Sequence, residues 1–499
     1  MNNSMIVYIL GQIIRLEGLL LVLPCATSLI YQEHEIFSFL VVIAACLVIG
    51  TLMTLKKPEN QTIYLKEGCV ATAFSWLALS IFGCMPFYIS GEIPSFTNAL
   101  FETISGFTTT GASILSDVEG MSHGMMLWRC FTHWIGGMGV LVFLLAVIPM
   151  NSASGTNMNL MKAESPGPSV GKLVPRLKHT ARILYVIYFG MTVLEVVFLL
   201  FGHMPLFDSL CTAFGTAGTG GFGIKNDSFA SFSPYIQWVV TVFMIMFGIN
   251  FNFYYFVLFR NIRKALSMEE VRTYLLIILG AITIITLSLM QTMANIGDAI
   301  RHAAFQVASI ITTTGYASAD FDQWSQMCKT VLVVLMFVGA CAGSTGGGMK
   351  VSRLVIMAKT VVKELGSYFH PKNIKKIKMD GKPVEHEVVR AVNVYFITIM
   401  GIFTASVFLV SIEGRDLVTN FTAVASCLNN IGPGLSQVGP TQNFGGLTGL
   451  SKYVLMFDML AGRLELFPLL LIFNPYIYRD MIMGVFRRIR RRRELRRTN

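Results

Sequence analysis

The chain has 499 residues, of which 54% are hydrophobic and only 13% are charged, and its formal net charge is +11. Soluble globular proteins carry about 25% charged residues, so this composition excludes an ordinary soluble protein and indicates a polytopic membrane protein. The positive excess lies in loops and at the C-terminal end, which does not indicate a nucleic-acid partner. Nine cysteines lie in apolar surroundings without a CxxC spacing, which predicts reduced core residues rather than metal ligands or disulfides.

Two apolar segments, 5–30 and 36–55, come first in the chain. The first is too long for the core of a signal peptide and has no small-residue cleavage site, so we expect it to remain as a helix. Together the two segments predict an N-terminal transmembrane hairpin over residues 1–60.

A short motif then returns four times at intervals of roughly 100 residues, which is typical of an internal repeat. Thr108 to Gly111 reads TTTG, Thr312 to Gly315 is a verbatim copy, and weaker copies occur at Thr216 to Gly220 and Asn429 to Gly432. Each copy follows a short apolar run and precedes a long apolar segment. This order predicts four units, each with a spanning helix, a short helix, a loop and a second spanning helix, at 61–150, 151–265, 266–384 and 385–482, followed by a basic tail at 483–499.

Within these units the expected helix boundaries follow the apolar runs. The short helices are expected at 97–106, 205–215, 298–311 and 416–428. The paired spanning helices are expected at 68–90 and 124–150, 180–202 and 233–260, 271–293 and 328–365, and 388–412 and 450–480. With the hairpin, these make ten expected spanning helices.

The composition of the repeated loops suits a dehydrated monovalent cation, which must exchange its water for a ring of oxygen atoms. Glycine lets successive carbonyl groups turn toward one axis, and non-helical backbone at membrane depth is tolerated where it lines a water-filled path. A single Thr/Gly turn would more simply join two helices, but four copies favour a filter, and the lack of charge within the loops favours K⁺-like ions over divalent ones. The expected ion-binding residues are Thr109, Thr110, Gly111, Thr219, Gly220, Thr313, Thr314, Gly315, Asn430, Ile431 and Gly432.

Alternating loop charge predicts the orientation. Basic residues gather at Lys56 and Lys57, from Lys162 to Arg182, from Arg260 to Lys264, from Lys350 to Arg390, and in the tail from Phe486 to Arg497. By the positive-inside rule both termini are expected in the cytoplasm, with the filter loops entering from outside. The basic tail either anchors the chain at anionic lipid or docks a cytosolic subunit.

The loops between them are acidic, with Asp117, Asp227, Asp320 and Asp322 shortly after three of the motifs. These acids either raise the local cation concentration at an outer mouth or are ordinary solvated loop residues.

A glycine-rich run interrupts the second spanning segment of the third unit, since glycine is costly inside a helix. We expect its residues Gly343, Ser344, Thr345, Gly346, Gly347 and Gly348 to form a gate across the inner end of the path. A nucleotide-phosphate loop is the rival interpretation, but the run lacks the GK[ST] ending of that motif.

Arg463 is an ionisable residue inside the last spanning segment, where charge is costly in lipid. It either faces the ion path and repels cations or forms a structural bridge to another helix. His123 and His133 make no metal-ligand pattern and are expected to be interface or core residues. No catalytic triad, zinc signature or nucleotide-binding fold is written in the sequence, so we expect no enzyme activity and no cofactor on this chain; a membrane enzyme or sensor would need clustered His, Asp or Glu.

Ser105 to Ser113, Thr312 to Gly315, Asn429 to Gly434 and Gly343 to Met349 resemble the corresponding motifs of the superfamily of Trk, Ktr and HKT potassium transporters, and the early hairpin resembles its TrkH-type bacterial members. The resemblance implies an all-α polytopic membrane fold, with four pseudo-repeated M1–P–M2 units around one pore, and K⁺ uptake across the bacterial plasma (inner) membrane. It implies that Gly111, Gly220, Gly315 and Gly432 are the filter glycines, that the glycine run is the gate, and that Arg463 is the pore cation. It also implies a homodimer and a TrkA-like cytosolic RCK regulatory subunit that binds a nucleotide.

Two points stay open at this stage. The second unit departs from the TTTG pattern, with Thr216-Ala217-Gly218-Thr219-Gly220. An alternative function is a secondary transporter that couples K⁺ uptake to H⁺ or Na⁺, for which Glu102 and Glu195 are the carboxylates to test.

Overall fold

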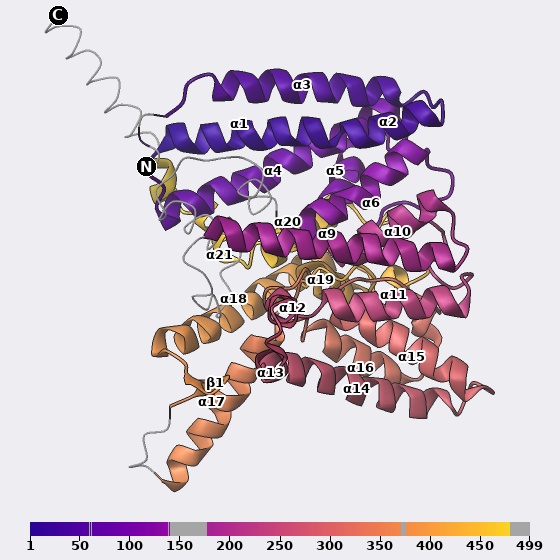
Figure 1. Cartoon of the computed structure of the whole chain (residues 1–499), viewed down its shortest axis with the longest axis vertical. Helices are drawn as coiled ribbons and strands as arrows, with labels where there is room; N and C mark the ends of the chain where they lie inside the picture. The colour runs from indigo at the N-terminus through magenta and orange to yellow at the C-terminus, as the bar shows by residue number, and fades with distance from the viewer. Residues whose placement is uncertain (59, 61, 138, 140–176, 371–375, 480–499) are drawn as a thin grey trace, which may run out of the picture.

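The computed structural model describes residues 1–58, 60, 62–137, 139, 177–370 and 376–479, and its main secondary structure is α-helical (Figure 1). The strands in this part of the chain form one small hairpin, β1 (Lys378–Met379) paired antiparallel with β2 (Lys382–Pro383). The predicted all-α membrane fold is therefore confirmed. The basic tail and most of the basic segment from Lys162 to Arg182 lie outside the described residues.

The N-terminal segments form α1 (Asn3–Leu20), α2 (Val22–Ile30) and α3 (Ile36–Thr54), which lie together along one side of the molecule (Figure 1). Glycines bring α1 and α3 close together, because a Cβ on Gly50 would lie 2.7 Å from the carbonyl oxygen of Gly11. Only 28% of the apolar stretch of α3 is buried, so this helix has a wide face for lipid contact.

The remaining helices follow the predicted order of long helix, short helix, loop and further helix. The first set is α4 (Leu65–Ser90), α5 (Phe96–Phe107) and α6 (His123–Gly137), and the second is α9 (Leu177–Phe201), α10 (Leu206–Gly218), α11 (Pro234–Phe247) and α12 (Phe251–Leu258). The third is α13 (Ile262–Leu266), α14 (Glu269–Leu289), α15 (Ile296–Ile311), η1 (Phe321–Gln323), α16 (Gln326–Met336) and α17 (Val351–Phe369). The fourth is α18 (His386–Ser411), α19 (Leu417–Leu428), η2 (Ser436–Val438), α20 (Gly449–Arg463) and α21 (Phe467–Ile472).

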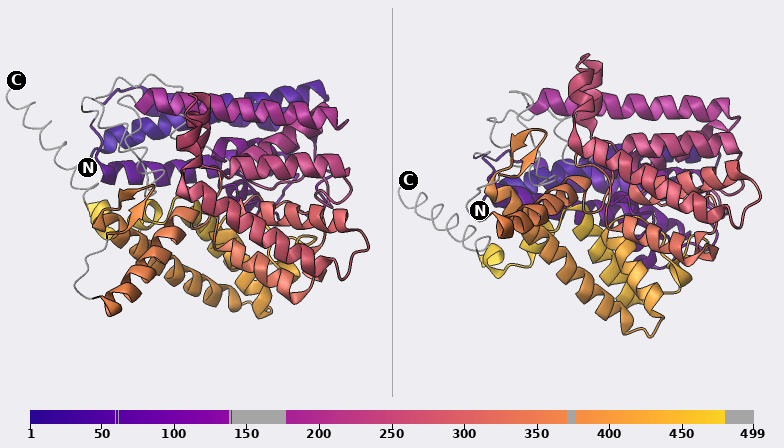
Figure 2. Two further views of the ribbon diagram at one scale, coloured as in Figure 1. Left: turned by 60° about the horizontal axis from the view of Figure 1, so that its bottom comes forward. Right: turned by 90° about the horizontal axis from the view of Figure 1, so that it is seen from below.

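The ten expected spanning segments do not all form continuous helices, and residues 138 and 140–150 of the one expected at 124–150 lie outside the described residues. Among the described residues, six helices are long and apolar enough to cross a membrane, or seven if the bent pair α11 and α12 counts as one. That pair bends by 91°, and Figure 2 shows α12 turned across the direction of α11. The predicted break between α16 and α17 is confirmed, and a further break separates α20 from α21 at Glu465 and Leu466, which both have positive φ. Hydropathy reports how long an apolar segment is but not where it turns, so the sequence pattern missed two of these three breaks.

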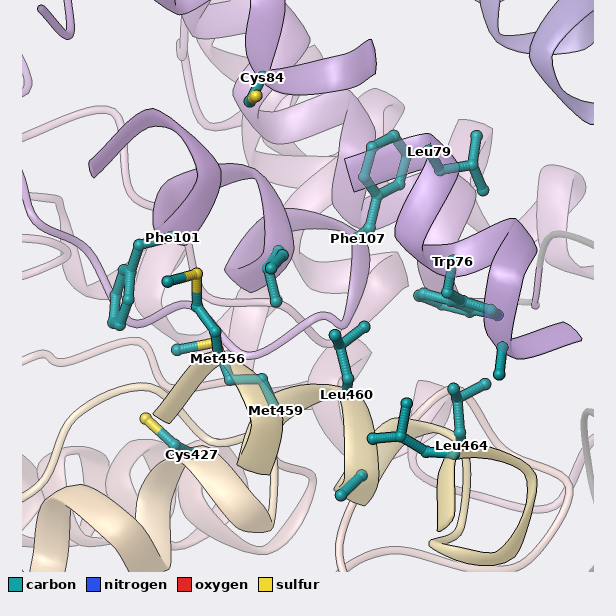
Figure 3. Packing of buried hydrophobic residues seen from close by; sticks show 14 of the residues in the cluster. Trp76, Leu79, Cys84, Phe101, Phe107, Cys427, Met456, Met459, Leu460 and Leu464 are labelled. Carbon is teal, nitrogen blue, oxygen red and sulfur yellow. The ribbon is translucent and has the colours of Figure 1, made fainter. Parts of the chain in front are cut away.

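The first and last sets of helices meet in one core. Met456, Met459 and Leu460 of α20 point toward Phe101 and Phe107 of α5, as Figure 3 shows. Leu464, at the end of α20, lies against Trp76 of α4 in the same cluster (Figure 3). The end of the chain thus packs against its beginning, so that the helices close around a common centre.

Candidate functional site

Each of the four short helices ends in the same backbone turn. After α5, Thr109 N–H donates to Gly106 O (3.0 Å) and Thr110 N–H donates to Ser105 O (2.8 Å). The equivalent two bonds close α10, α15 and α19. This is the Schellman arrangement, in which the residue beyond the helix is left-handed. That residue has φ between 54° and 60° in all four turns and is Thr109, Thr219, Thr313 or Asn430.

Left-handed backbone is unusual for threonine, whose branched Cβ crowds the backbone there. Such strain costs on the order of 1–3 kcal/mol per residue and gathers at functional sites. Three of the four turns carry threonine at this position, which marks these turns as a candidate site. Their N–H groups are bonded back to the short helices, so the carbonyl oxygens that follow are available for other partners.

Two residues after each left-handed residue comes a glycine with φ between 79° and 103°. These glycines are Gly111, Gly221, Gly315 and Gly432. The predicted register of the second segment is therefore displaced by one residue: Gly221, not Gly220, is the equivalent of Gly111. Gly220 instead corresponds to Thr110, Thr314 and Ile431. The sequence allowed either assignment because two glycines stand side by side.

The four glycines form a closed ring of contacts. A Cβ built on Gly111 would collide with the carbonyl oxygen of Gly220, and one on Gly221 would collide with that of Thr314. Likewise, a Cβ on Gly315 would collide with the carbonyl oxygen of Ile431, and one on Gly432 would lie 2.8 Å from that of Thr110. Each glycine thus meets the carbonyl of the residue before the next glycine, and the fourth leads back to the first. The structure brings the four predicted segments together around one axis.

Hydrogen bonds of threonine side chains stabilise the turns that carry the ring. The hydroxyl of Thr110 lies 2.8 Å from that of Thr108, and the Asn430 amide donates to the Thr110 hydroxyl over 3.0 Å. In the third segment the same pair is Thr312 and Thr314, with hydroxyls 2.7 Å apart. These bonds fix the backbone from which the carbonyls project.

One side of the ring opens into a cavity lined by the four glycines and by the loop residues that follow them. Asp117, Asp227, Asp320 and Asp322 are not among its lining residues. Asp117 instead accepts from Asn226 Nδ2 over 2.9 Å, and this hydrogen bond lowers the pKa of its carboxyl. Asp117 thus holds Asn226, which lines the cavity, without lining the cavity itself.

The glycine-rich segment lies on the opposite side of the ring. We call residues 343–348 the gate loop, after the role that the sequence predicts for them. Gly347 N–H donates to the hydroxyl of Thr313 over 2.6 Å, and a Cβ on Gly346 would lie 2.9 Å from the carbonyl oxygen of Thr312. On its other side the loop carbonyl of Gly343 accepts from Phe251 N–H (3.0 Å). The loop is thus placed directly against the left-handed turns.

Arg463 connects this loop to the first set of helices. Its guanidinium donates to Thr345 O (2.8 Å) and Gly137 O (2.7 Å), and also to Gly136 O. It therefore bridges two parts of the chain immediately beneath the ring, while remaining partly exposed. Glu465, two residues later, pairs with Arg353 of α17 rather than with Arg463.

Sequence reasoning missed two groups that hold the site. Glu270 of α14 accepts from the N–H groups of Ala342 (2.6 Å) and Ser352 (3.2 Å), which flank the gate loop. Lys350 donates to Gly346 O within the loop. Both residues come from segments that look like ordinary helix starts, and the sequence carries no local signal for their role.

Glu102 of α5 is paired with Arg129 of α6 over 2.7 Å, and both side chains are almost fully buried. Glu102 also accepts from the Ser113 hydroxyl and the Ile114 N–H, each at 2.9 Å. Arg129 donates in turn to Gly223 O (3.0 Å), beyond the second ring glycine. This carboxyl is therefore fully engaged in holding two of the loops. Glu195 of α9 is completely buried and lies close to Thr216, in the last turn of α10.

These features define a membrane protein with four converging backbone loops, and comparison with known proteins gives its family. The family model of the TrkH cation transport proteins matches residues 35–483, and the chain belongs to this family.

Among curated proteins, it is 32% identical to the Trk system potassium uptake protein TrkH of Salmonella typhimurium and 33% identical to that of Halomonas elongata, in each case over 96% of this chain and 100% of the relative. Among solved structures, the crystal structure of the potassium transporter TrkH from Vibrio parahaemolyticus matches with a TM-score of 0.86 and 29% identity, over 95% of this chain and 99% of that one.

Proposed function

We propose that this chain mediates K⁺ uptake across the bacterial plasma membrane, with the four loops acting as a selectivity filter. The observation that carries the proposal is the ring in which each glycine meets the carbonyl oxygen of the next segment. Backbone carbonyls around one axis replace the hydration shell of a monovalent cation. The C-terminal ends of the short helices also point their partial negative charge toward the same centre. The names of the relatives agree with this substrate.

The gate loop and Arg463 are proposed to close the path below the filter. The loop is bonded to Thr313 on the ring and to Arg463 on α20. In this arrangement an ion leaving the filter meets backbone and a guanidinium charge rather than open space. Opening then requires the loop to exchange these hydrogen bonds for water.

Regulation by a cytosolic nucleotide-binding subunit, assembly as a homodimer and cytoplasmic placement of both termini complete the proposal. α17, whose basic residues include Lys359 and Lys363, lies on the same side of the molecule as the N-terminus (Figure 1). The positive-inside rule supports a cytoplasmic assignment for this side. Anionic lipid is the other partner this charge favours.

Coupling of K⁺ uptake to H⁺ or Na⁺ is the alternative mechanism. Glu102 is a poor candidate for a proton carrier because its carboxyl is engaged by Arg129, Ser113 and Ile114. A K⁺ reversal potential that stays constant when the pH gradient is changed would exclude proton coupling, and a shift would support it.

The filter is tested by growth of a K⁺-uptake-deficient bacterium on low K⁺. The intact chain should restore growth, and Gly315→Ser or Gly315→Asp should abolish it, because any Cβ there collides with the Ile431 carbonyl. Gly381→Ser is the matched control: Gly381 also has positive φ (75°), but nothing lies within 4 Å of its Cβ position. Growth with Gly315→Asp at normal protein levels would contradict the proposed filter.

A further inference from the structure

The second filter segment lacks a side chain that the other three possess. At the position before the ring glycine, the first and third segments carry Thr110 and Thr314, whose hydroxyls are held by neighbouring threonines. The fourth carries the fully buried Ile431. The second carries Gly220, although its backbone does not have positive φ. Backbone conformation therefore does not explain why glycine stands there.

The imidazole of His133 occupies the missing space. A Cβ built on Gly220 would collide with the ring atoms Cγ, Nδ1 and Cδ2 of His133, and one on Gly218 would collide with the carbonyl of the same residue. His133 comes from α6, in the preceding set of helices, and is completely buried. A side chain from one segment thus fills a position in the next.

The ring nitrogens of His133 also join two segments by hydrogen bonds. Nδ1 lies 2.7 Å from Gly106 O at the end of α5, and Nε2 lies 3.2 Å from Phe222 N, directly after the ring glycine Gly221. A carbonyl can only accept and a backbone N–H can only donate, so His133 is the neutral tautomer with its proton on Nδ1. Its ring also packs on that of Phe222, with centroids 4.2 Å apart.

We propose that His133 is the substitute side chain of the second filter segment. It fills the volume that a residue at position 220 would take, and its bond to Phe222 N–H fixes the peptide that follows Gly221. The inference rests on the proposed filter. His133 is a positioning residue: it does not touch the ion but sets where the carbonyls of the second segment lie, and so contributes to the choice between K⁺ and Na⁺.

The alternative is a histidine that only stabilises the core, and cation discrimination separates the two. The measurement is the ratio of K⁺ to Na⁺ permeation in proteoliposomes containing the full chain, for His133→Ala, Gly220→Thr and the double variant. His133→Ala removes the acceptor for a buried N–H, which should lower the ratio by about tenfold. Gly220→Thr should lower it similarly through the collision, while the double variant should recover discrimination because the new side chain enters the vacated space.

The proposal is judged by comparing the K⁺/Na⁺ ratios of the two single variants with that of the double variant. A double variant worse than either single variant, or a Gly220→Thr protein with unchanged discrimination, would overturn the proposal. Gly220→Thr also serves if His133→Ala does not accumulate in the membrane. His123→Ala is the matched control, since His123 lies on the same helix but at the surface, stacked on Tyr31, and should leave the ratio unchanged.

Gly315→Ser in the same assay distinguishes a failure of the proposed filter from a failure of the role proposed for His133. If it leaves both the K⁺ flux and the ratio unchanged, the filter assignment itself fails. If it abolishes the flux or alters the ratio while the His133 and Gly220 variants change neither, the filter stands and only the role of His133 is rejected.

Discussion

Glu270 provides the sharpest test of the gate, because one carboxyl oxygen holds both ends of the gate loop. Its Oε1 accepts from Ala342 N–H and Ser352 N–H, and the residue is 3% exposed. Glu270→Ala leaves two buried N–H groups without an acceptor, at about 1–3 kcal/mol each. The closed loop should therefore lose about 2–6 kcal/mol relative to an open one whose amides reach water, which shifts the population by about 30-fold or more.

The assay is Rb⁺ efflux from proteoliposomes that contain the purified chain alone, at matched protein amounts. Glu270→Ala should raise the flux strongly, and Glu270→Gln should raise it less because it keeps an acceptor oxygen. Glu269→Ala is the control on the same helix: its partner is the half-exposed Lys359, and such surface pairs contribute only about 0–1 kcal/mol. Equal or lower flux in Glu270→Ala than in the unaltered chain would refute the argument that this loop is the barrier.

Three further outcomes follow from other contacts. Arg463→Gln removes the charge and most of the bridge to the gate loop, so flux through the purified chain should rise by about tenfold; unchanged flux would mean that Arg463 is not part of the barrier. Arg129→Met leaves Glu102 buried and unpaired, which should lower the free energy of unfolding by about 3–5 kcal/mol, and adding Glu102→Gln should restore part of it; thermal unfolding in detergent measures both. For Glu413, burial acts to raise the pKa, but hydrogen bonds from Ser451 and other neighbours outweigh it and lower the pKa to about 2. Its contribution to stability is therefore complete above its ordinary value of 4.5 and is lost as the pH falls toward 2, so Glu413→Gln should flatten the acid side of a plot of unfolding temperature against pH.

The sequence predicted those parts of the site whose conformation depends only on residues nearby in the chain. Thr108 to Gly111 and its copies are visible because the same turn needs the same residue types each time. The interruption of α16 and α17 is visible because several glycines in a row cannot remain helical. These features depend on neighbours in sequence, which a pattern can read.

The parts that depend on another segment were not predictable in this way. The register of the second segment was misjudged because Gly220 is explained by His133, which lies on an earlier helix. The bend after α11 occurs at Gly248, a single glycine in an apolar run, where a Cβ would collide with the Tyr274 hydroxyl. In both cases the cause is a contact between segments far apart in the chain.

The second helices contact more than one segment of the ring. A Cβ on Gly136 of α6 would collide with Phe107 O, before the first turn, and the same helix supports the second turn through His133. Beyond α11, Gly248 lies against Thr312, before the third turn.

The gate loop touches Thr312 and, through Gly347, the carbonyl of Asn429 before the fourth turn. α20 supports the fourth turn through the bond from Asn430 Nδ2 to Met459 O (2.9 Å), and the same amide bonds the hydroxyl of Thr110 in the first.

The second helices and the gate loop thus contact the ring at places where one filter segment adjoins the next. Glycines stand at two of these contacts, Gly136 and Gly248, where a Cβ would come within 3 Å of a neighbouring filter segment. A substitution at one of these places should therefore disturb the carbonyl groups of two filter segments rather than one. For this reason the effect of a substitution at Gly220 is expected to depend on the residue at position 133.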